Sequence, residues 1–356
     1  MMSSKDKLRN MKTTRTLTET LPERLVEHRA VKAWAALNPE RVVPESIEVL
    51  KFKRLESKSA VYRLNGVAPD GSTVIAKRCC SLTAAVERII YEEFLPQLPL
   101  PAVRYYGHVD EPGGEFCWLF LENAGRLEYS PRDAGHRSLA ARWLASIQAA
   151  AVGAGLETRL PTRDTDYYLH LLRSTRDRLG QHFSNAELFA ADVETLRNLS
   201  SQFDAIEAHW TELRDTCDGL PPTLVHGDFV AKNVRLGADS KSPAFLVFDW
   251  EYAGWGVPAT DLSQFIGRSV SPDLEVYSAF LNASSRAYRG SARRLAECGK
   301  FFRLIEKISW PGSALTFGPY SLLEKPLSYL KSYEPRVAEA LREANWNNAN
   351  EQCGHA

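Results

Sequence analysis

The stretch LVHGDFVAKNVRL, residues 224–236, decides how the rest of the chain is interpreted. It opens with apolar, β-prone residues that lead directly into His226, Gly227 and Asp228. Asn233 follows the aspartate by five residues, and a second apolar run begins at Val234. The pattern therefore predicts a strand, then a loop that carries an imidazole, a carboxylate and an amide, and then another strand.

A hairpin is predicted just after this loop. VRL, residues 234–236, and PAFLVF, residues 243–248, are strand-like, and the polar turn GADSKS lies between them. The second of these strands ends at Asp249, so Asp228, Asn233 and Asp249 are expected to converge at one end of the hairpin. Hard cations such as Mg²⁺ take oxygen ligands of this kind together with substrate phosphates. Asn233 and Asp249 fit a metal site, which leaves Asp228 to meet the proton of a substrate hydroxyl.

Composition narrows the class of protein. In the 356 residues, 44 Lys and Arg balance 44 Asp and Glu, so no global charge favours nucleic acid or a membrane surface as a partner. The six cysteines lack metal-ligand spacing, and we expect reduced thiols in a cytoplasmic protein. The longest apolar-looking stretch, residues 138–156, contains Arg142 and Gln148 and predicts a helix of the core rather than a membrane span. Oligomeric state is left open by the sequence.

The sequence pattern predicts that the N-terminal part is rich in strands. Residues 1–20 are polar and basic without an apolar signal region, and we interpret them as a disordered tail, with a transit peptide as the alternative. Residues 21–37 predict a helix. Strands are expected at 46–55, 59–66 and 72–80, a helix at 81–98, and two more strands near 103–109 and 116–122, together forming a small mixed sheet.

Beyond this part the pattern becomes mostly helical. ENAGRLEYSP, residues 122–131, interrupts the apolar pattern with small and polar residues, and helical periodicity dominates from about residue 132. We therefore predict an α+β chain with a β-rich N-lobe at 21–122, a connector at 123–126 and a helical C-lobe at 127–356 that carries the hairpin.

HGDFVAKN, residues 226–233, followed by VFDWEYAGWGVPATDL, residues 247–262, resembles the aminoglycoside phosphotransferase-like family of small-molecule kinases. The resemblance implies a bilobal, protein-kinase-like fold. It also implies that Asp228 orients or deprotonates the acceptor hydroxyl, while Asn233 and Asp249 bind Mg²⁺. Asp261 is then structural, either capping a helix or bracing the catalytic loop.

The resemblance extends to the N-terminal part. In TVIAKRC, Lys77 stands where kinases keep the lysine that binds the nucleotide phosphates. Glu87 is the best match for its glutamate partner, with Glu92 and Glu93 as alternatives. LFLENAG, residues 119–125, resembles the hinge, where backbone groups near Glu122 and Asn123 would bind the adenine.

One feature departs from the usual kinase pattern. The predicted nucleotide loop, LESKSAVY at residues 55–62, contains no glycine, and Ser57 and Ser59 are expected to bring amides and hydroxyls to the phosphates instead. Val230 replaces the lysine that protein kinases place two residues after the catalytic aspartate, which favours a small-molecule kinase.

Two classes of function follow. The first is a phosphotransferase that moves the γ-phosphate of ATP or GTP to a hydroxyl of a small metabolite or antibiotic, with Mg²⁺ as cofactor. The alternative is a pseudokinase, which would bind nucleotide without turnover. After residue 261 basic residues outnumber acidic ones, which disfavours a polycationic acceptor. An aromatic cage for a quaternary ammonium is left open by the aromatic residues near Asp249.

Overall fold

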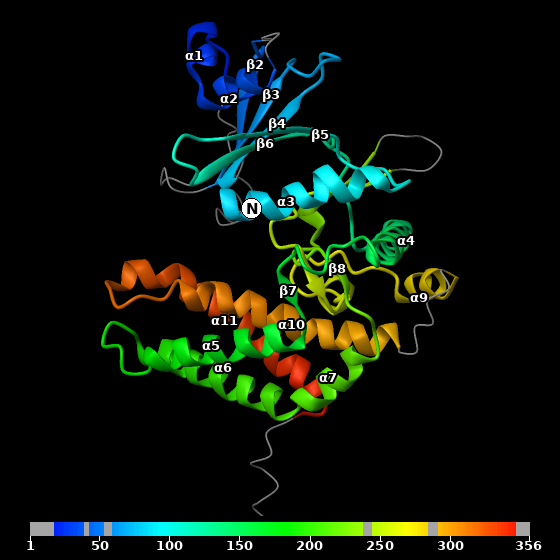
Figure 1. Cartoon of the computed structure of the whole chain (residues 1–356). Coiled ribbons are helices and arrows are strands. Elements are labelled where there is room, and N and C mark those ends of the chain that lie inside the picture. The colour runs from blue at the N-terminus through cyan, green and yellow to red at the C-terminus, as the bar shows by residue number, and fades with distance from the viewer. Residues whose placement is uncertain (1–17, 39–42, 53–58, 238–243, 284–290, 347–356) are drawn as a thin grey trace, which may run out of the picture. The chain divides into compact units, whose positions relative to one another are not determined.

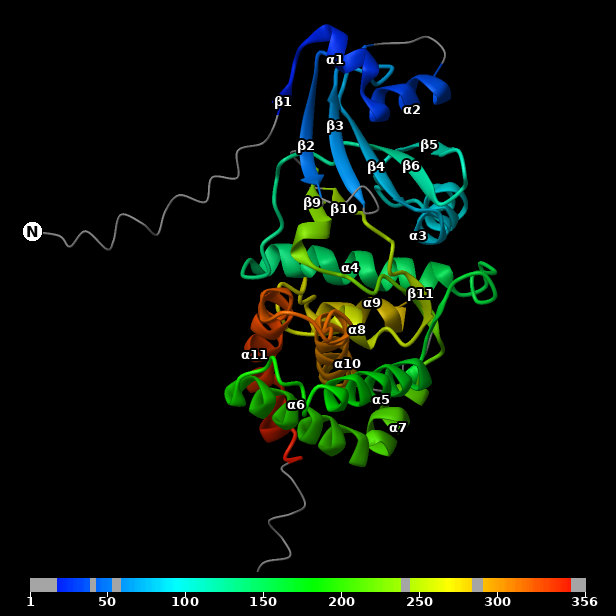
Figure 2. The same cartoon turned by 90° about the vertical axis from the view of Figure 1, so that its left-hand side faces the viewer.

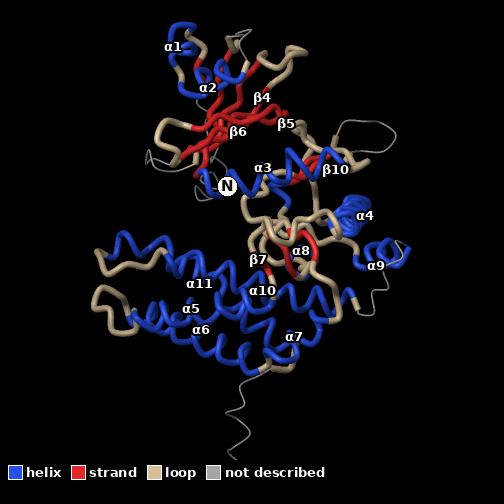
Figure 3. Tube along the Cα trace, viewed as in Figure 1, coloured by secondary structure: helices blue, strands red, loops and turns tan. Residues whose placement is uncertain are grey.

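The computed structural model describes residues 18–38, 43–52, 59–237, 244–283 and 291–346. The chain divides into two compact units, a first unit of residues 1–92 with 102–124 and a second unit of residues 93–101 with 125–356. The first unit is built mainly on a sheet and the second mainly on helices (Figures 1 and 3). The fold is therefore α+β.

An antiparallel sheet of six strands forms the first unit in the part that the structure describes (Figure 2). Its spatial order is β1-β2-β3-β4-β6-β5, and every neighbouring pair is antiparallel. The mixed sheet expected from the sequence is thus wrong. Short turns join β3 to β4 and β5 to β6 as antiparallel neighbours, and the helices that precede β2 and follow β4 do not lead to a parallel pair in the described sheet. The strands are β1 (Thr18–Glu19), β2 (Ser46–Phe52), β3 (Ala60–Asn65), β4 (Val74–Cys80), β5 (Tyr105–Asp110) and β6 (Phe116–Glu122).

Both faces of the sheet are covered. Because side chains alternate along a strand, Trp118 and Phe120 of β6 point to one face and Cys117 and Leu119 to the other. The first face packs against α1 (Pro22–Glu27) and α2 (Arg29–Leu37), whose Trp34 lies in the same core. The second face packs against α3 (Ser81–Arg88), which continues as a π-helical turn over Ile89–Phe94.

Three boundaries differ from the sequence prediction. The helix expected at 21–37 is two helices, because His28 has an extended backbone and its Nδ1 accepts from the amide of Ala30 to begin α2. Of the predicted tail at residues 1–20, residues 1–17 lie outside the described part of the chain. Thr18–Glu19 is not disordered, because it pairs with β2. Residues 93–101 belong to the second unit, where the Glu93 carboxylate bonds to Arg159 at 2.5 Å.

Helices build most of the second unit, and local sequence explains where two of them begin. Asp133 and Asp164 cap α4 and α5 by accepting from the backbone amides of His136 and Tyr167, at 3.0 and 2.8 Å. The helices are α4 (Ala134–Ala151), α5 (Thr165–Gln181), α6 (Ala190–Ala208), α7 (Trp210–Asp218), α8 (Ala259–Leu262), α9 (Leu274–Ala283), α10 (Ala292–Ser313) and α11 (Tyr320–Glu343).

Two small sheets hold the loop of residues 226–233. The predicted hairpin is present as β9 (Val234–Leu236) paired antiparallel with β10 (Phe245–Val247). The strand that precedes the loop, β8 (Thr223–Val225), lies in a different sheet, where it pairs with β11 (Gly254–Gly256), and β11 pairs with β7 (Thr162–Arg163). The loop thus links two sheets, and its ends are fixed independently.

None of the helices in the described ranges is both long and apolar enough to cross a membrane. The helix α4, which falls in the longest apolar-looking stretch, instead buries Trp143, Leu144 and Ile147 in the protein core.

Candidate active site

A buried ion pair links strand and helix in the first unit. Lys77 lies in β4 and Glu87 in α3, and the Lys77 Nζ donates to Glu87 Oε1 at 2.5 Å. Lys77 is 5% exposed and Glu87 fully buried. The structure therefore brings these two predicted residues together and does not select Glu92, which bonds to Arg88 and Tyr105, or Glu93.

The predicted hinge residues stand at the end of β6. The amide of Glu122 donates to the Arg104 carbonyl at 2.8 Å, and the amide of Asn123 donates to the Thr73 carbonyl at 3.3 Å. These two donors are thus used inside the sheet, so a base bound here would have to use other backbone groups. Ser59 is half-buried and immediately precedes β3, whereas Ser57 lies outside the described residues.

The loop between β8 and β9 depends on a glycine at its tightest point. Gly227 has φ +77°, and a Cβ at this position would stand 2.3 Å from the carbonyl oxygen of Tyr252. Only glycine fits both the left-handed backbone and the close approach of this neighbouring segment. The central residue of His226-Gly227-Asp228 is therefore fixed by backbone geometry.

Asp228 and Asn233 meet across the loop, as predicted. The Asn233 Nδ2 donates to Asp228 Oδ2 at 3.1 Å and to the Asp228 carbonyl at 3.0 Å. Asp249 is positioned from the hairpin, since the amide of the preceding Phe248 donates to the Asn233 carbonyl at 3.1 Å. Asp249 itself has φ +68°, a conformation that costs energy in a residue with a side chain. Asp228 and Asn233 are therefore in contact, and Asp249 directly follows a residue bonded to the Asn233 backbone, although β8 lies outside the hairpin.

The oxygens of Asn233 and Asp249 fit a magnesium site. Both hydrogen bonds of Asn233 Nδ2 go to Asp228, so its amide oxygen takes no part in that contact. The donor set, one amide oxygen and one carboxylate, is what a hard cation prefers. The strained backbone of Asp249 is a further sign of a functional position.

Asp261 holds the loop in place through hydrogen bonds to its backbone. Its carboxylate accepts from the amide of His226 at 2.7 Å and from the amide of Gly227 at 3.2 Å. Burial raises the pKa of Asp261 to about 6, against the opposing effect of the His226 hydrogen bond. Of the two structural roles implied for Asp261, the described contacts are those of a brace, not of a helix cap.

His226 supports the loop as a neutral imidazole. Its Nε2 lies 3.2 Å from the Phe248 carbonyl, and its Nδ1 accepts from the amide of Asp228 at 3.3 Å. Burial lowers the pKa of His226 to about 4, despite the neighbouring Asp228. Since one nitrogen must donate and the other accept, the neutral form with the proton on Nε2 satisfies both bonds.

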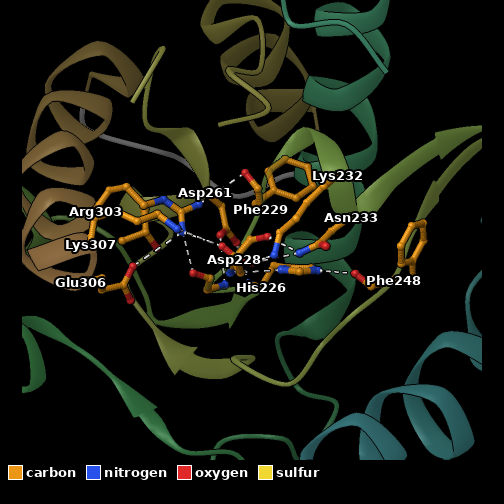
Figure 4. Close-up of polar contacts among 12 residues, drawn as sticks. His226, Asp228, Phe229, Lys232, Asn233, Phe248, Asp261, Arg303, Glu306 and Lys307 are labelled. Carbon is orange, nitrogen blue, oxygen red and sulfur yellow. Dashed lines mark hydrogen bonds and ion pairs between the residues drawn. The ribbon is translucent and has the colours of Figure 1, made fainter. Parts of the chain in front are cut away.

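Arg303 holds the loop in place on the side that faces α10. It lies in α10 with 1% of its surface exposed, and its Nη1 donates to the Gly227 carbonyl at 2.7 Å. Its Nη2 reaches the Phe229 carbonyl at 3.4 Å. The carbonyls on either side of Asp228 are thus held by one guanidinium, which fixes the direction of the carboxylate between them (Figure 4).

Two lysines contact the Asp228 carboxylate from opposite sides (Figure 4). Lys232 Nζ lies 3.0 Å from Oδ2, and Lys307 Nζ, from α10, lies 3.3 Å from Oδ1. Burial alone would raise the pKa of Asp228, but the charges of Lys307, Arg303 and Lys232 outweigh it and hold the pKa well below the usual range. The carboxylate is therefore ionised and strongly polarised by cations.

Sequence reasoning missed Arg303 and Lys307, and the sequence alone does not decide whether Lys232 contacts a phosphate or solvent. The signal for Arg303 is an arginine within the apolar run FFRLI, residues 301–305, where a charged residue requires a buried partner. Lys307 follows it by four residues, which places both on one face of a helix. No sequence pattern near Arg303 or Lys307 indicates that the loop of residues 226–233 is their partner, because more than 70 residues separate them from it.

Of the aromatic residues near Asp249, Tyr252 is 47% exposed, whereas Trp250 is buried. Trp250 is 1% exposed and packs against Trp143 and His226 in the core, with ring centroids 6.1 and 4.5 Å away. Tyr168, from the aromatic cluster at 166–172, is fully buried and stacks on Phe302 at 4.4 Å. The rings of Trp250 and Tyr168 therefore stabilise the core.

Comparisons with known proteins agree with this geometry. The model of the phosphotransferase enzyme family (APH) matches residues 76–297, and no curated protein matches the chain. A thermostable mutant of aminoglycoside phosphotransferase APH(4)-Ia, in a ternary complex with AMP-PNP and hygromycin B, aligns with TM-score 0.55 and 12% identity over 92% of this chain and 99% of its own.

Two further solved structures are similar. The GDP complex of wild-type aminoglycoside 2'-phosphotransferase-IIIa aligns with TM-score 0.58 and 12% identity over 86% of this chain and 97% of its own. Choline kinase from Cryptosporidium parvum Iowa II aligns with TM-score 0.52 and 12% identity over 86% of this chain and 92% of its own. The predicted bilobal, protein-kinase-like fold is thereby confirmed, since all three share it with this chain.

Proposed function

The chain belongs to the phosphotransferase enzyme family, and we propose that it transfers the γ-phosphoryl group of ATP or GTP to a hydroxyl of a small molecule. The observation that carries the proposal is the environment of Asp228. Its carboxylate is ionised and held in a loop that Asp261 and Arg303 fix from two sides. Phosphoryl transfer needs such fixed positioning more than it needs covalent chemistry.

Asp228 orients the acceptor. The acceptor oxygen attacks the γ-phosphorus, the bond from that phosphorus to the β-phosphate oxygen breaks, and the nucleoside diphosphate leaves. The hydroxyl proton passes to Asp228 as the new bond forms. Because neighbouring cations hold the pKa of Asp228 low, the carboxylate acts first by accepting a hydrogen bond and takes the proton only late in the step.

Asn233 and Asp249 would hold Mg²⁺, which would neutralise phosphate charge when bound. Within the protein, Lys232 lies beside Asn233 in sequence and contacts the same oxygen of Asp228. Its side chain is 57% exposed, so its ammonium can leave Asp228 for a phosphate oxygen without an unfavourable change in burial. We assign it to the stabilisation of charge that develops during transfer.

Lys77 would bind the α- and β-phosphates, with Glu87 holding its ammonium in place. A buried lysine that is bonded to a buried carboxylate has a defined direction, which favours pre-organised binding. Backbone groups near Glu122 and Asn123 would bind the base, and Ser59 and Ser57 the phosphates. Two of the similar structures hold AMP-PNP and GDP, which supports both ATP and GTP as candidates.

Calorimetric titration of Mg-ATP and Mg-GTP into the wild-type chain tests the nucleotide site. We expect metal-dependent binding of at least one nucleotide, and Asp249→Ala should weaken it by at least about tenfold because a metal ligand is lost. Asp215→Ala serves as the matched control, since Asp215 is an exposed aspartate of α7.

The outcomes separate the two functions that the sequence leaves open. Metal-dependent binding together with transfer to a hydroxyl supports the proposal. Binding without transfer to any acceptor would identify a pseudokinase. An affinity for Mg-nucleotide that Asp249→Ala leaves unchanged would show that the metal lies elsewhere.

A further inference from the structure

The carboxylate of Asp228 has two chemically different sides. Oδ2 faces the predicted metal ligands, with Asn233 Nδ2 at 3.1 Å and Lys232 Nζ at 3.0 Å. Oδ1 faces α10, with Lys307 Nζ at 3.3 Å and Arg303 Nη1 at 3.8 Å. Since the nucleotide phosphates would follow the metal, the acceptor would approach Asp228 from the side of α10 (Figure 4).

One strip of α10 leads from the core past Asp228 to the surface. Gly299, Arg303, Lys307 and Trp310 recur at helical spacing and so share a face. At Gly299 the helix touches α8, where a Cβ would stand 1.8 Å from the Ala259 carbonyl. From Arg303 through Lys307 to Trp310 the exposed fraction rises from 1% to 30% to 55%. The strip therefore runs outward past the catalytic carboxylate.

The first chemical feature of this strip is a cation beside Asp228. An ammonium can donate three hydrogen bonds, and among the described residues that of Lys307 bonds only to Asp228 Oδ1. Arg303 is already committed to two backbone carbonyls. Glu306 is an acidic residue on the same side of α10. Its carboxylate lies 3.7 Å from Arg303, and burial raises the pKa of Glu306 to about 7. The α10 side of Asp228 thus has a lysine that can take a second anion.

The second feature is an exposed aromatic ring one turn further on. Trp310 stands three residues after Lys307, about 4.5 Å along the helix axis. Its ring packs edge-on against Tyr329 of α11, with centroids 5.6 Å apart and an interplanar angle of 82°. This contact leaves Trp310 55% exposed and gives an apolar surface beside the cation.

On the basis of the proposed phosphotransfer, we propose that the acceptor is a hydroxylated compound with an anionic group and an apolar body. Its hydroxyl meets Asp228, its carboxylate or phosphate binds Lys307, and its apolar part lies on Trp310. A cationic acceptor would place an ammonium next to that of Lys307, which is unfavourable at short range. The acceptor class therefore differs from the amino sugars and choline of the similar structures.

The test uses three probes that share a phenyl ring and a hydroxyl but differ in charge. These are 3-phenyllactate, the neutral 3-phenyl-1,2-propanediol and the cationic phenylalaninol. Each is titrated by calorimetry into the full chain saturated with Mg-ADP. We expect phenyllactate to bind at least about tenfold more tightly than the diol, and phenylalaninol to bind weakest. Glycerate, which lacks the ring, and glycerol phosphate separate the contributions of the ring and of the kind of anion.

Variants then assign the effect. Lys307→Met should remove the preference for the acid while leaving the Mg-ADP affinity within about twofold, and Lys307→Arg should restore part of it. Lys300→Met is the matched control, because Lys300 lies in the same helix but bonds to Glu343. Trp310→Ala should weaken phenyllactate and leave glycerate unchanged.

Several results would overturn the inference. Tightest binding of phenylalaninol, absence of binding by every acid at about 10 mM, or an acid preference that survives Lys307→Met would each do so. A loss of Mg-ADP affinity in Lys307→Met would instead place this lysine on the nucleotide phosphates. Failure of the wild-type chain to bind Mg-ADP at all would count against the proposed function rather than against the acceptor class alone.

Discussion

Buried charge is arranged differently in the two units. In the first unit Lys77 and Glu87 form a buried ion pair from neighbouring elements, separated by ten residues in sequence. In the second unit the Asp228 carboxylate faces Lys232, Arg303 and Lys307, and the last two come from a helix more than 70 residues away. An ion pair of this first kind holds a side chain in position, whereas three cations around one carboxylate prepare a site for additional negative charge.

This difference gives each region its own chemical task. The pair in the first unit holds the Lys77 ammonium in a fixed position, which suits the binding of the nucleotide phosphates that are not transferred. The cluster in the second unit surrounds the place where charge moves during transfer, so it can stabilise a transition state. Variants that separate binding from turnover therefore test whether the two regions differ as proposed.

The largest expected effect is at Asp228. Asp228→Asn keeps the shape of the side chain but removes its charge and its capacity to take a proton. Turnover should fall by about 10³-fold or more, while the affinity for Mg-nucleotide stays within about twofold. Steady-state kinetics and calorimetry on the same preparation measure both quantities. Retention of normal turnover would remove Asp228 from the mechanism.

The next effect is expected at Arg303. Arg303→Met leaves the buried carbonyls of Gly227 and Phe229 without their donor, so the free energy of unfolding should fall by about 3 kcal/mol. Turnover should fall by about 10²-fold because the loop is no longer fixed. Denaturation and kinetics check this against Arg293→Met, an exposed position in the same helix. Equal stability of the two variants would mean that Arg303 does not hold the loop.

A smaller and different effect is expected at Lys77. Lys77→Met should weaken the binding of Mg-nucleotide by at least about tenfold, since a phosphate contact is lost. The affinity for the acceptor should not change in the presence of saturating nucleotide. Calorimetry with Lys51→Met, an exposed lysine of the same sheet, as control would show whether the loss is specific. Unchanged nucleotide affinity would contradict the role assigned to the pair.

The last effect is on stability and depends on pH. His226 has a folded pKa of about 4, below its ordinary value of 6.5, so its contribution to stability is present above pH 6.5 and is lost as the pH falls toward 4. Protonated Nδ1 can no longer accept from the amide of Asp228. Between pH 7 and pH 5 the wild-type chain should lose about 2 kcal/mol of stability through this residue.

Denaturation of His226→Gln at both pH values isolates this contribution. The variant should lack it, so its stability relative to wild type should improve on acidification. His170→Gln, at an exposed position of α5, should follow the wild type. A difference between His226→Gln and wild type that does not vary with pH would mean that the imidazole is not held in its neutral form.

Short-range patterns made much of the molecule predictable. The strands β2 to β6 of the first unit, the hairpin of β9 and β10, and the meeting of Asp228 with Asn233 follow from periodicity and spacing within about thirty residues. The division of one expected N-terminal helix at His28 was not predictable, because it depends on the bond from Nδ1 to the amide of Ala30 rather than on hydrophobic pattern.

Long-range contacts explain what the sequence could not reveal. Arg303 and Lys307 have the pattern of an ordinary helix, and their relation to Asp228 arises only when α10 packs beneath the loop. The close contact at Gly299 that permits this packing is likewise invisible in an isolated helix. The pairing of β8 with β11 instead of the hairpin also results from tertiary arrangement, since both partners are only three residues long.

We propose that Asp228 directs transfer of the γ-phosphoryl group to a small hydroxylated acceptor. Phosphorus NMR of Mg-ATP incubated with the probe compounds and a set of neutral and cationic alcohols is the decisive measurement. We expect a new phosphomonoester resonance and an equal amount of ADP with the wild-type chain, and neither with Asp228→Asn. A chain that binds Mg-ATP but forms no phosphomonoester with any alcohol, or a variant that forms as much as wild type, would contradict it.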